Sequence, residues 1–313
     1  MKINEEKLKS LLKKNYGILV KTLTPLNGFY DKNYKITTAS ANYFIKIYGF
    51  DKLPSIKFQL DFLSKCFKYG LPVAKVIQTN SKTSYFKIDK TYGILQEFLG
   101  GEQLRNIKIN RSVVTDIGFI LGSIHKLSHR SNFIGKKWKR YQWDLAQFNI
   151  VVKDYHKIKN IIPSWISDLI DEVITEWKSN KIKLAKLRKG SIHNDFQGRN
   201  ILVAKDGKIS IVDFGDAINS WYIADIAISL AHICFTVKQP SIFIKSFLRG
   251  YQKQFKLLKL EKDFLPLLMK MRAVTAIVEI QLLKGKKGIF HPPDNQLVNL
   301  LKYFKDTKAK NIF

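Results

Sequence analysis

Residues 193–216 constrain the fold and the chemistry of this chain more than any other segment. They read HNDFQGRNILVAKDGKISIVDFGD, so an H-x-D-x-x-x-x-N loop comes ahead of an Asp-Phe-Gly triplet. A carboxylate at Asp195 is followed by an amide at Asn200 and a second carboxylate at Asp213. These are the side chains that phosphoryl transfer requires, because one carboxylate can accept a hydroxyl proton and two oxygen ligands can hold Mg²⁺.

The segment between the loop and the triplet predicts a β-hairpin. Asp206 and Gly207 separate two alternating, β-branched runs, and this dipeptide favours a two-residue type I′ turn. The register of such a hairpin would set Asn200 opposite Asp213, with β-carbons roughly 5 Å apart. The alternative is a metal-free hairpin with a capped turn.

Three polar residues, two of them in or just after this segment, are expected to have structural roles. His193 is in a position where histidine more often shapes the loop than acts in catalysis. The segment WYIADIAISLAHICFTV, from Trp221, is apolar almost all round, so it predicts a helix buried in a large domain. Asp225 near its start cannot be buried unpaired, so we expect it to cap backbone donors or to bind the loop that carries Asp195. His125 is likewise expected to be a structural histidine.

Length and composition limit the compartment and the partners. The 313 residues suffice for two lobes, and the two cysteines have no metal-ligand spacing. The N-terminal segment mixes both charges and lacks the apolar core of a signal peptide, so we expect a cytoplasmic protein without a membrane segment.

The formal net charge of +29 raises the alternative of a protein that binds nucleic acid or an anionic membrane. Only eight of the 54 basic residues are arginines, and the 46 lysines are spread over nearly every segment. The local lysine clusters also lack the interleaved aromatic residues of a single-strand binder. We therefore interpret the charge as solvated lysine faces and expect no dedicated nucleic-acid site; the sequence does not indicate an oligomeric state.

Three phrases carry a resemblance to a known family: G-S-I-H-N-D-F-x-x-x-N-I-L-V, then I-V-D-F-G-D-A, then A-D-I-A-I-S-L-A. Over roughly residues 20–280 the chain resembles the aminoglycoside phosphotransferase and choline kinase-like family of the protein-kinase-like superfamily. The FGDA and ADIAISLA phrasing is closest to hydroxylysine kinase-like proteins, and the small-lobe phrase KLPSIKFQLDFLSK…GLPV also resembles type II homoserine kinases. Both groups phosphorylate hydroxylated amino acids. The resemblance implies a bilobal α+β fold, with a small antiparallel N-lobe (1–98), a hinge near 96–101 and a mainly α-helical C-lobe (99–313).

The resemblance also implies cofactors and residue roles. The cofactors would be Mg²⁺ and ATP, with GTP as the alternative nucleotide. The implied roles are catalytic base for Asp195, metal ligand for Asn200 and Asp213, phosphate binding for Lys46 and Gly28, and backbone contact with the adenine for Glu97 and Leu99.

The chain departs from the family pattern in the helix expected at 53–69. A kinase presents a glutamate there to pair with the strand lysine, but this helix contains no glutamate, and Asp61 is its only acid. Either Asp61 substitutes for the glutamate, or Lys46 is held by the phosphates alone. The departure also supports an alternative function, that of a non-catalytic nucleotide-binding protein.

The charges around the C-terminal half bear on the identity of the hydroxyl acceptor. Acids are sparse after Asp225, whereas a polyamine sugar needs a cleft dense in carboxylates. A hydroxylated amino acid is therefore favoured over an aminoglycoside, with choline or another amino alcohol as an alternative. Such a zwitterion needs a carboxylate for its ammonium group, Asp216 or Glu279, and a cation for its carboxylate, Arg272 or Arg199. Each of these four also has an interpretation as a surface or helix-pairing residue.

Overall fold

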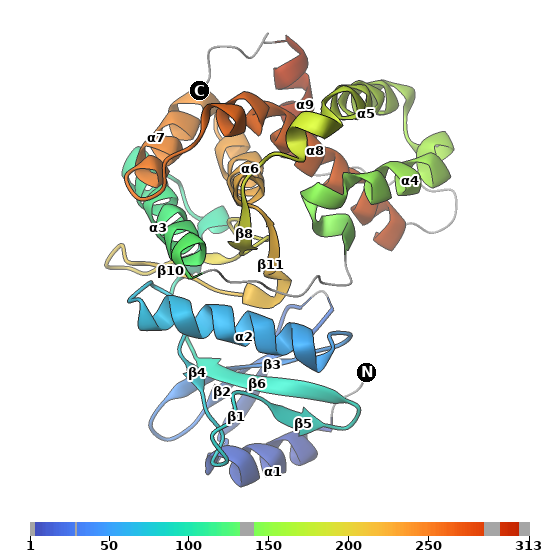
Figure 1. Cartoon of the computed structure of the whole chain (residues 1–313). Helices are drawn as coiled ribbons and strands as arrows, with labels where there is room; N and C mark the ends of the chain where they lie inside the picture. The colour runs from blue at the N-terminus through green and yellow to red at the C-terminus, as the bar shows by residue number, and fades with distance from the viewer. Residues whose placement is uncertain (1–3, 29, 132–140, 285–294, 307–313) are drawn as a thin grey trace. The chain divides into compact units, whose positions relative to one another are not determined.

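The computed structural model describes residues 4–28, 30–131, 141–284 and 295–306. The chain divides into two compact units, which are described separately here. Unit 1 contains residues 1–101 and 202–215, and unit 2 contains residues 102–201 and 216–313. An antiparallel sheet dominates the first and helices dominate the second (Figure 1), which confirms the predicted α+β class.

The sheet of unit 1 is antiparallel throughout, in the order β1-β2-β3-β6-β4, and β5 also pairs with β6. Its strands are β1 (Thr22–Leu26), β2 (Lys32–Thr37), β3 (Asn42–Ile47), β4 (Val76–Ile77), β5 (Phe86–Ile88) and β6 (Thr91–Glu97).

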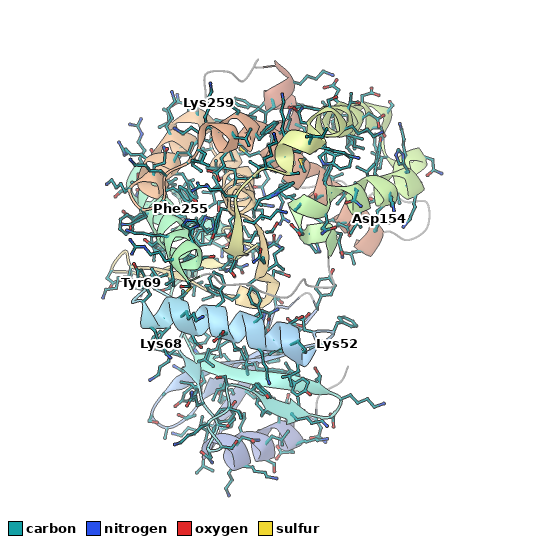
Figure 2. The ribbon with its side chains drawn as sticks, viewed as in Figure 1. Lys52, Lys68, Tyr69, Asp154, Phe255 and Lys259 are labelled. Carbon is teal, nitrogen blue, oxygen red and sulfur yellow. The ribbon has the colours of Figure 1, made fainter. Side chains whose placement is uncertain are left out.

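Two helices cover opposite faces of this sheet, α1 (Glu5–Tyr16) and α2 (Leu53–Lys68) (Figure 1). Successive side chains of a strand point to opposite faces, so β3 contributes to both. Ile45 and Ile47 pack in the cluster that includes Leu8 and Leu12 of α1. Lys46 lies between these two isoleucines, so its side chain projects from the α2 face. Figure 2 shows α2 between the labelled Lys52 and Lys68.

In the hairpin of β9 (Ile201–Val203) and β10 (Ile209–Ile211), Ala204 pairs with Lys208 and closes a three-residue loop, 205–207, so the predicted two-residue turn is wrong. Ala204 donates its backbone N–H to the carbonyl of Lys208 at 2.9 Å, and Gly207 donates to the carbonyl of Ala204 at 2.9 Å. Gly207 has a φ of 81°, whereas Asp206 does not have the positive φ that a type I′ turn requires at both central residues.

The side chain of Asp206 gives a physical reason for the longer loop. Its Oδ1 accepts the backbone N–H of Lys208 at 3.1 Å, a local bond that competes with the two-residue turn. The pairing shifts by one residue, so the register argument that set Asn200 opposite Asp213 does not hold.

Unit 2 consists mainly of helices, together with β7 (Glu102–Gln103) and a two-stranded antiparallel sheet of β8 (Lys189–Ile192) and β11 (Ile218–Trp221). The helices are α3 (Arg111–Arg130), α4 (Phe148–Ile158), α5 (Ser164–Leu184), α6 (Tyr222–Ile233), α7 (Pro240–Gln252), α8 (Lys259–Lys284) and α9 (Asn295–Asp306). Helix α6 is buried along most of its length, as its all-apolar sequence predicts. In the described part of the chain, no helix is both long enough and apolar enough to cross a membrane.

Helices α3 and α7 lie side by side (Figure 1), and glycines allow their backbones to approach closely. A β-carbon added to Gly118 would lie 2.1 Å from the carbonyl oxygen of Phe247, and one added to Gly122 would lie 2.5 Å from that of Tyr251. Larger residues at either glycine would force the helices apart. The close packing brings His125 of α3 to the Tyr251 hydroxyl, at 2.8 Å.

Candidate active site

The loop after β8 is fixed by the buried carboxylate of Asp225, in the first turn of α6. Asp225 Oδ2 accepts the backbone N–H of His193 at 2.7 Å, and its Oδ1 accepts that of Asn194 at 2.6 Å. Asn194 has a φ of 63°, a conformation that the loop turn requires and that asparagine adopts more readily than most residues. The structure therefore confirms that Asp225 binds the loop carrying Asp195.

Two histidines complete this support. His125 Nε2 lies 3.1 Å from Asp225 Oδ2, and its Nδ1 contacts the hydroxyl of Tyr251. Burial raises the pKa of Tyr251 well above its usual value, so the hydroxyl remains protonated and can donate to Nδ1, which leaves Nε2–H to donate to Asp225. His193 Nδ1 accepts the backbone N–H of Asp195 at 3.3 Å. Both histidines have the structural roles that the sequence predicts.

The Asp195 carboxylate is oriented by amide donors from its own loop. Gln197 Nε2 donates to Oδ1 at 2.6 Å, and Asn200 Nδ2 donates to Oδ2 at 2.7 Å. Asn200 Nδ2 also lies 2.9 Å from the backbone carbonyl of Asp195. These bonds fix the carboxylate in a partly buried position, from which it can accept a proton from a hydroxyl group.

Arg272 of α8 brings a buried positive charge to this carboxylate. Its Nη2 lies 3.5 Å from Asp195 Oδ1, its guanidinium carbon lies 5.0 Å from the centre of the Trp143 ring, and its side chain is 4% exposed. Its Nε donates to Nε2 of His232 at 3.2 Å. Burial, together with Arg272 and Arg199, lowers the pKa of His232 well below its usual value, so the imidazole stays neutral and can accept this bond.

The other three predicted substrate residues have different surroundings. Asp216 is partly buried and, with Asp195 and Asp225, opposes the lowering of the Arg272 pKa that burial causes. Arg199 is exposed. Glu279 is buried, and its pKa is raised to about 7 by burial and by Asp154 of α4, which Figure 2 labels. Of the two candidate arginines, Arg272 is therefore the one in ionic contact with Asp195.

In unit 1, Lys46 lies between two carboxylates. Its Nζ is 2.5 Å from Oδ1 of Asp213 and 3.4 Å from Oδ2 of Asp31, and the residue is 4% exposed. Burial lowers the pKa of Lys46, but the two carboxylates more than offset this effect, so the pKa is raised and the ammonium group stays charged. Asp31, in the connection between β1 and β2, has no fixed spacing from Lys46 that would have identified it from the sequence.

Helix α2 contacts the Asp-Phe-Gly turn through an amide. Gln59 is 2% exposed, and its Nε2 donates to the carbonyl oxygen of Gly215 at 2.7 Å. Phe62, one turn along, packs edge-on against Phe214 with ring centres 5.6 Å apart. Asp61 is exposed. The carboxylates in ionic contact with Lys46 are thus those of Asp31 and Asp213, and neither belongs to α2.

Replacing Asp61 with alanine is expected to leave nucleotide affinity within about twofold of wild type, because Asp61 is exposed and a substitution at an exposed position usually has a small effect. If Lys46 binds the nucleotide phosphates as the resemblance implies, Lys46→Met should weaken nucleotide binding at least about tenfold, the effect of losing a little over 1 kcal/mol of charge-assisted hydrogen bonding. Isothermal titration calorimetry with ADP measures both constants. Equal losses in the two variants would show that Asp61 does act with Lys46.

The other residues for which the sequence analysis expects nucleotide contacts lie in unit 1. Gly28 packs closely on the following turn, because an added β-carbon would lie 2.3 Å from the carbonyl oxygen of Asp31. Glu97 ends β6 and donates its backbone N–H to the carbonyl of Lys75 at 2.9 Å, so this N–H is already bonded within the chain. Leu99, two residues later, is partly buried.

The donor chemistry of Asp213 and Asn200 fits Mg²⁺. Asp213 has a φ of 62°, its side chain is 36% exposed, and its Oδ1 accepts the backbone N–H of Gly215 at 3.1 Å. The Nδ2 group of Asn200 is directed to Asp195, so the amide Oδ1 is the atom of this side chain that could bind a cation. Mg²⁺ takes one or two protein oxygen ligands of this kind and keeps waters or phosphates in its other positions.

Comparison with known proteins finds similarity to phosphotransferases in a family model and in individual proteins. Residues 22–261 match the family model described as the Phosphotransferase enzyme family. Hydroxylysine kinase from Xenopus laevis is 25% identical over 313 residues, which cover 88% of this chain and 82% of that protein. Homoserine kinase from Caulobacter vibrioides is 24% identical over 254 residues, which cover 77% of this chain and 75% of that protein.

Solved structures with low sequence identity share the fold. An amicoumacin kinase in complex with AMP-PNP and Ca²⁺ superimposes with a TM-score of 0.74 at 18% identity, covering 98% of this chain and 94% of that one. The choline kinase of Streptococcus pneumoniae gives a TM-score of 0.62 at 14% identity, covering 96% and 97%.

Proposed function

Because the chain belongs to the phosphotransferase enzyme family, we propose that it transfers the γ-phosphoryl group of ATP to the hydroxyl group of a hydroxylated amino acid. The chain is a small-molecule phosphotransferase, and the finer proposal concerns its acceptor. Hydroxylysine kinases and homoserine kinases, at 18–25% identity, are among its relatives. Their acceptors share a hydroxyl, an ammonium and a carboxylate group.

The buried Arg272 beside Asp195 is the observation that carries this proposal. A guanidinium group has five N–H donors in a fixed fork, which matches the two oxygens of a carboxylate. Its 3.5 Å separation from Asp195 Oδ1 exceeds the 2.7–2.9 Å of a charge-assisted hydrogen bond, so this ion pair is loose. His232 and Trp143 hold the guanidinium group in place, and we infer that the same group binds the carboxylate of the acceptor.

The proposed roles combine what the family resemblance implies with the contacts found within each unit. Asp195 accepts the proton of the acceptor hydroxyl, and Gln197 and Asn200 keep its carboxylate in one orientation. Lys46 binds the α- and β-phosphates. Mg²⁺, with Asp213 and Asn200 as its protein ligands, would neutralise phosphate charge. The carbonyl of Glu97 and the N–H of Leu99 bind the adenine.

The phosphorylation of a panel of acceptors tests the function. ADP formation would be measured with hydroxylysine, homoserine, choline, an aminoglycoside and the amino alcohol that each amino acid gives on decarboxylation. We expect the hydroxylated amino acids to have the highest kcat/KM. Preference for choline, an amino alcohol or an aminoglycoside would show that the site recognises a cation without a carboxylate.

Arg272→Met should raise the KM for the hydroxylated amino acid by about 30-fold, because a charge-assisted pair contributes roughly 2 kcal/mol. The KM for ATP should change far less, since Lys46 binds the phosphates. Arg199→Met is the matched control, as it removes an exposed arginine from the same unit. Steady-state kinetics with both substrates varied separates the two constants. A similar rise in both KM values would argue against carboxylate recognition by Arg272.

A further inference from the structure

The ionic cluster of unit 1 carries an excess of negative charge. One ammonium group, Lys46, contacts the carboxylates of Asp31 and Asp213, so the three groups together have a formal charge of −1. The Lys46 and Asp31 side chains are 5% and 12% exposed, so bulk water screens this charge only in part. A phosphate group that approaches Lys46 therefore meets two carboxylates as well as the ammonium.

Asp31 is held in this cluster by the close packing of its backbone and by the carboxylate oxygen that does not contact Lys46. Oδ1 accepts the backbone N–H of Gly49 at 3.0 Å, while Oδ2 is the oxygen that contacts Lys46. The Asp31 carbonyl packs so tightly against Gly28 that a β-carbon there would lie 2.3 Å away, and Gly49 packs against the Tyr30 carbonyl in the same way. The two carboxylate oxygens thus have separable roles, one in anchoring the loop and one in setting the charge beside Lys46.

The charge balance has a consequence for nucleotide binding. A metal-free triphosphate is strongly anionic, and the net negative cluster opposes its approach. A divalent cation adds two positive charges and turns the cluster from −1 to +1, which favours the same phosphates. If Asp31 were neutral, Lys46 and Asp213 would balance each other, and the metal-free nucleotide would meet no net repulsion.

We propose that Asp31 is an electrostatic specificity residue that makes the Lys46 site accept a nucleotide as its Mg²⁺ complex and reject the metal-free nucleotide. This inference rests on the proposed function, in which Lys46 binds phosphate. Of the two acids beside Lys46, Asp31 is the one that comes from the β1–β2 connection. Its charge therefore lies in the segment expected to cover the phosphates.

Asp31→Asn isolates the charge from the anchoring role. Asparagine keeps an Oδ1 that can accept the Gly49 N–H, but it removes the negative charge beside Lys46. Asp31→Ser is a second variant with a shorter hydroxyl acceptor, for use if the asparagine variant folds poorly. Asp61→Asn is the matched control, because it removes an exposed acid from the same unit.

Isothermal titration calorimetry of the full chain with AMP-PNP, once with excess Mg²⁺ and once with EDTA, measures the effect. In Asp31→Asn the metal-free complex should tighten at least about tenfold more than the Mg²⁺ complex. The Kd of the metal-free nucleotide divided by the Kd of the Mg²⁺ complex should therefore fall by that factor. Asp61→Asn should keep the wild-type ratio. Tripolyphosphate, titrated in the same two buffers, should show the same change, because the effect concerns the phosphates alone.

Two outcomes would overturn the inference. An unchanged Kd ratio in both Asp31 variants would show that the charge does not control metal dependence, and equal weakening of both complexes would show that Asp31 serves only to anchor the loop. A wild-type chain that binds AMP-PNP in neither buffer would instead contradict the proposed function itself.

Discussion

Asp195→Asn is expected to lower kcat at least about a thousandfold, an increase of roughly 4 kcal/mol in the activation barrier. Asparagine has nearly the shape of aspartate, but it cannot accept the hydroxyl proton at neutral pH. It also changes one acceptor oxygen into an amide donor, which would face the donating Nε2 of Gln197 or Nδ2 of Asn200. Nucleotide affinity should change only slightly, through the altered bond to Asn200, because the other residues proposed to bind the nucleotide and its Mg²⁺ belong to unit 1.

Steady-state kinetics and titration calorimetry together test this expectation. The kcat value reports the loss of the base, and the Kd for ADP with Mg²⁺ shows whether nucleotide binding is intact. Asp168→Asn, which changes an exposed aspartate of α5, is the control for the loss of one carboxylate from unit 2. Turnover of Asp195→Asn within tenfold of wild type would remove the catalytic assignment.

Asp213→Ala is expected to abolish the contribution of Mg²⁺ to nucleotide binding. A carboxylate is a stronger ligand for a hard divalent cation than a neutral amide, so Asn200→Ala should reduce this contribution less. The alanine variant also removes the closer of the two carboxylates from Lys46. Metal-free binding should therefore persist in it, or become tighter.

Calorimetric titration of ADP with and without Mg²⁺ separates this effect from the one proposed for Asp31. In Asp213→Ala the Kd ratio should fall mainly because the Mg²⁺ complex weakens, whereas in Asp31→Asn it should fall because the metal-free complex tightens. Asn200→Ala also disturbs Asp195 through the lost Nδ2 bonds, so its kcat should fall as well. Equal metal dependence in wild type and Asp213→Ala would count against the metal site.

Some contacts of the candidate site could be predicted from the sequence, whereas most contacts between distant segments could not. The partners of Asp225 could be predicted, because a buried carboxylate needs donors and the loop before it supplies backbone N–H groups. Gln197 was not singled out, although its place two residues after Asp195 would allow the contact. Trp143 and His232, which hold Arg272, come from separate helical segments and have no signal of their own.

The hairpin is an instructive failure at short range. Asp206 and Gly207 suit a two-residue turn, and the sequence correctly predicts that a hairpin forms there. The Asp206 carboxylate bonds to the Lys208 N–H and favours a three-residue loop, which moves the strand pairing by one position. A single hydrogen bond contributes only about 1 kcal/mol, and the residue types in the turn do not show whether this bond forms.

The sequence by itself indicated the α+β class through its resemblance to a known family, and its own patterns determined the loop that presents Asp195 and the buried helix that carries Asp225. These features depend on periodicity and on hydrogen bonds between residues near in sequence, so a short segment contains the information. Only the tertiary structure decided that Asp31 is an acid beside Lys46, and that Arg272 rather than Arg199 contacts Asp195. Successive side chains of an α-helix project about 100° apart around its axis. The packing of whole elements therefore decides which side chain reaches a distant partner.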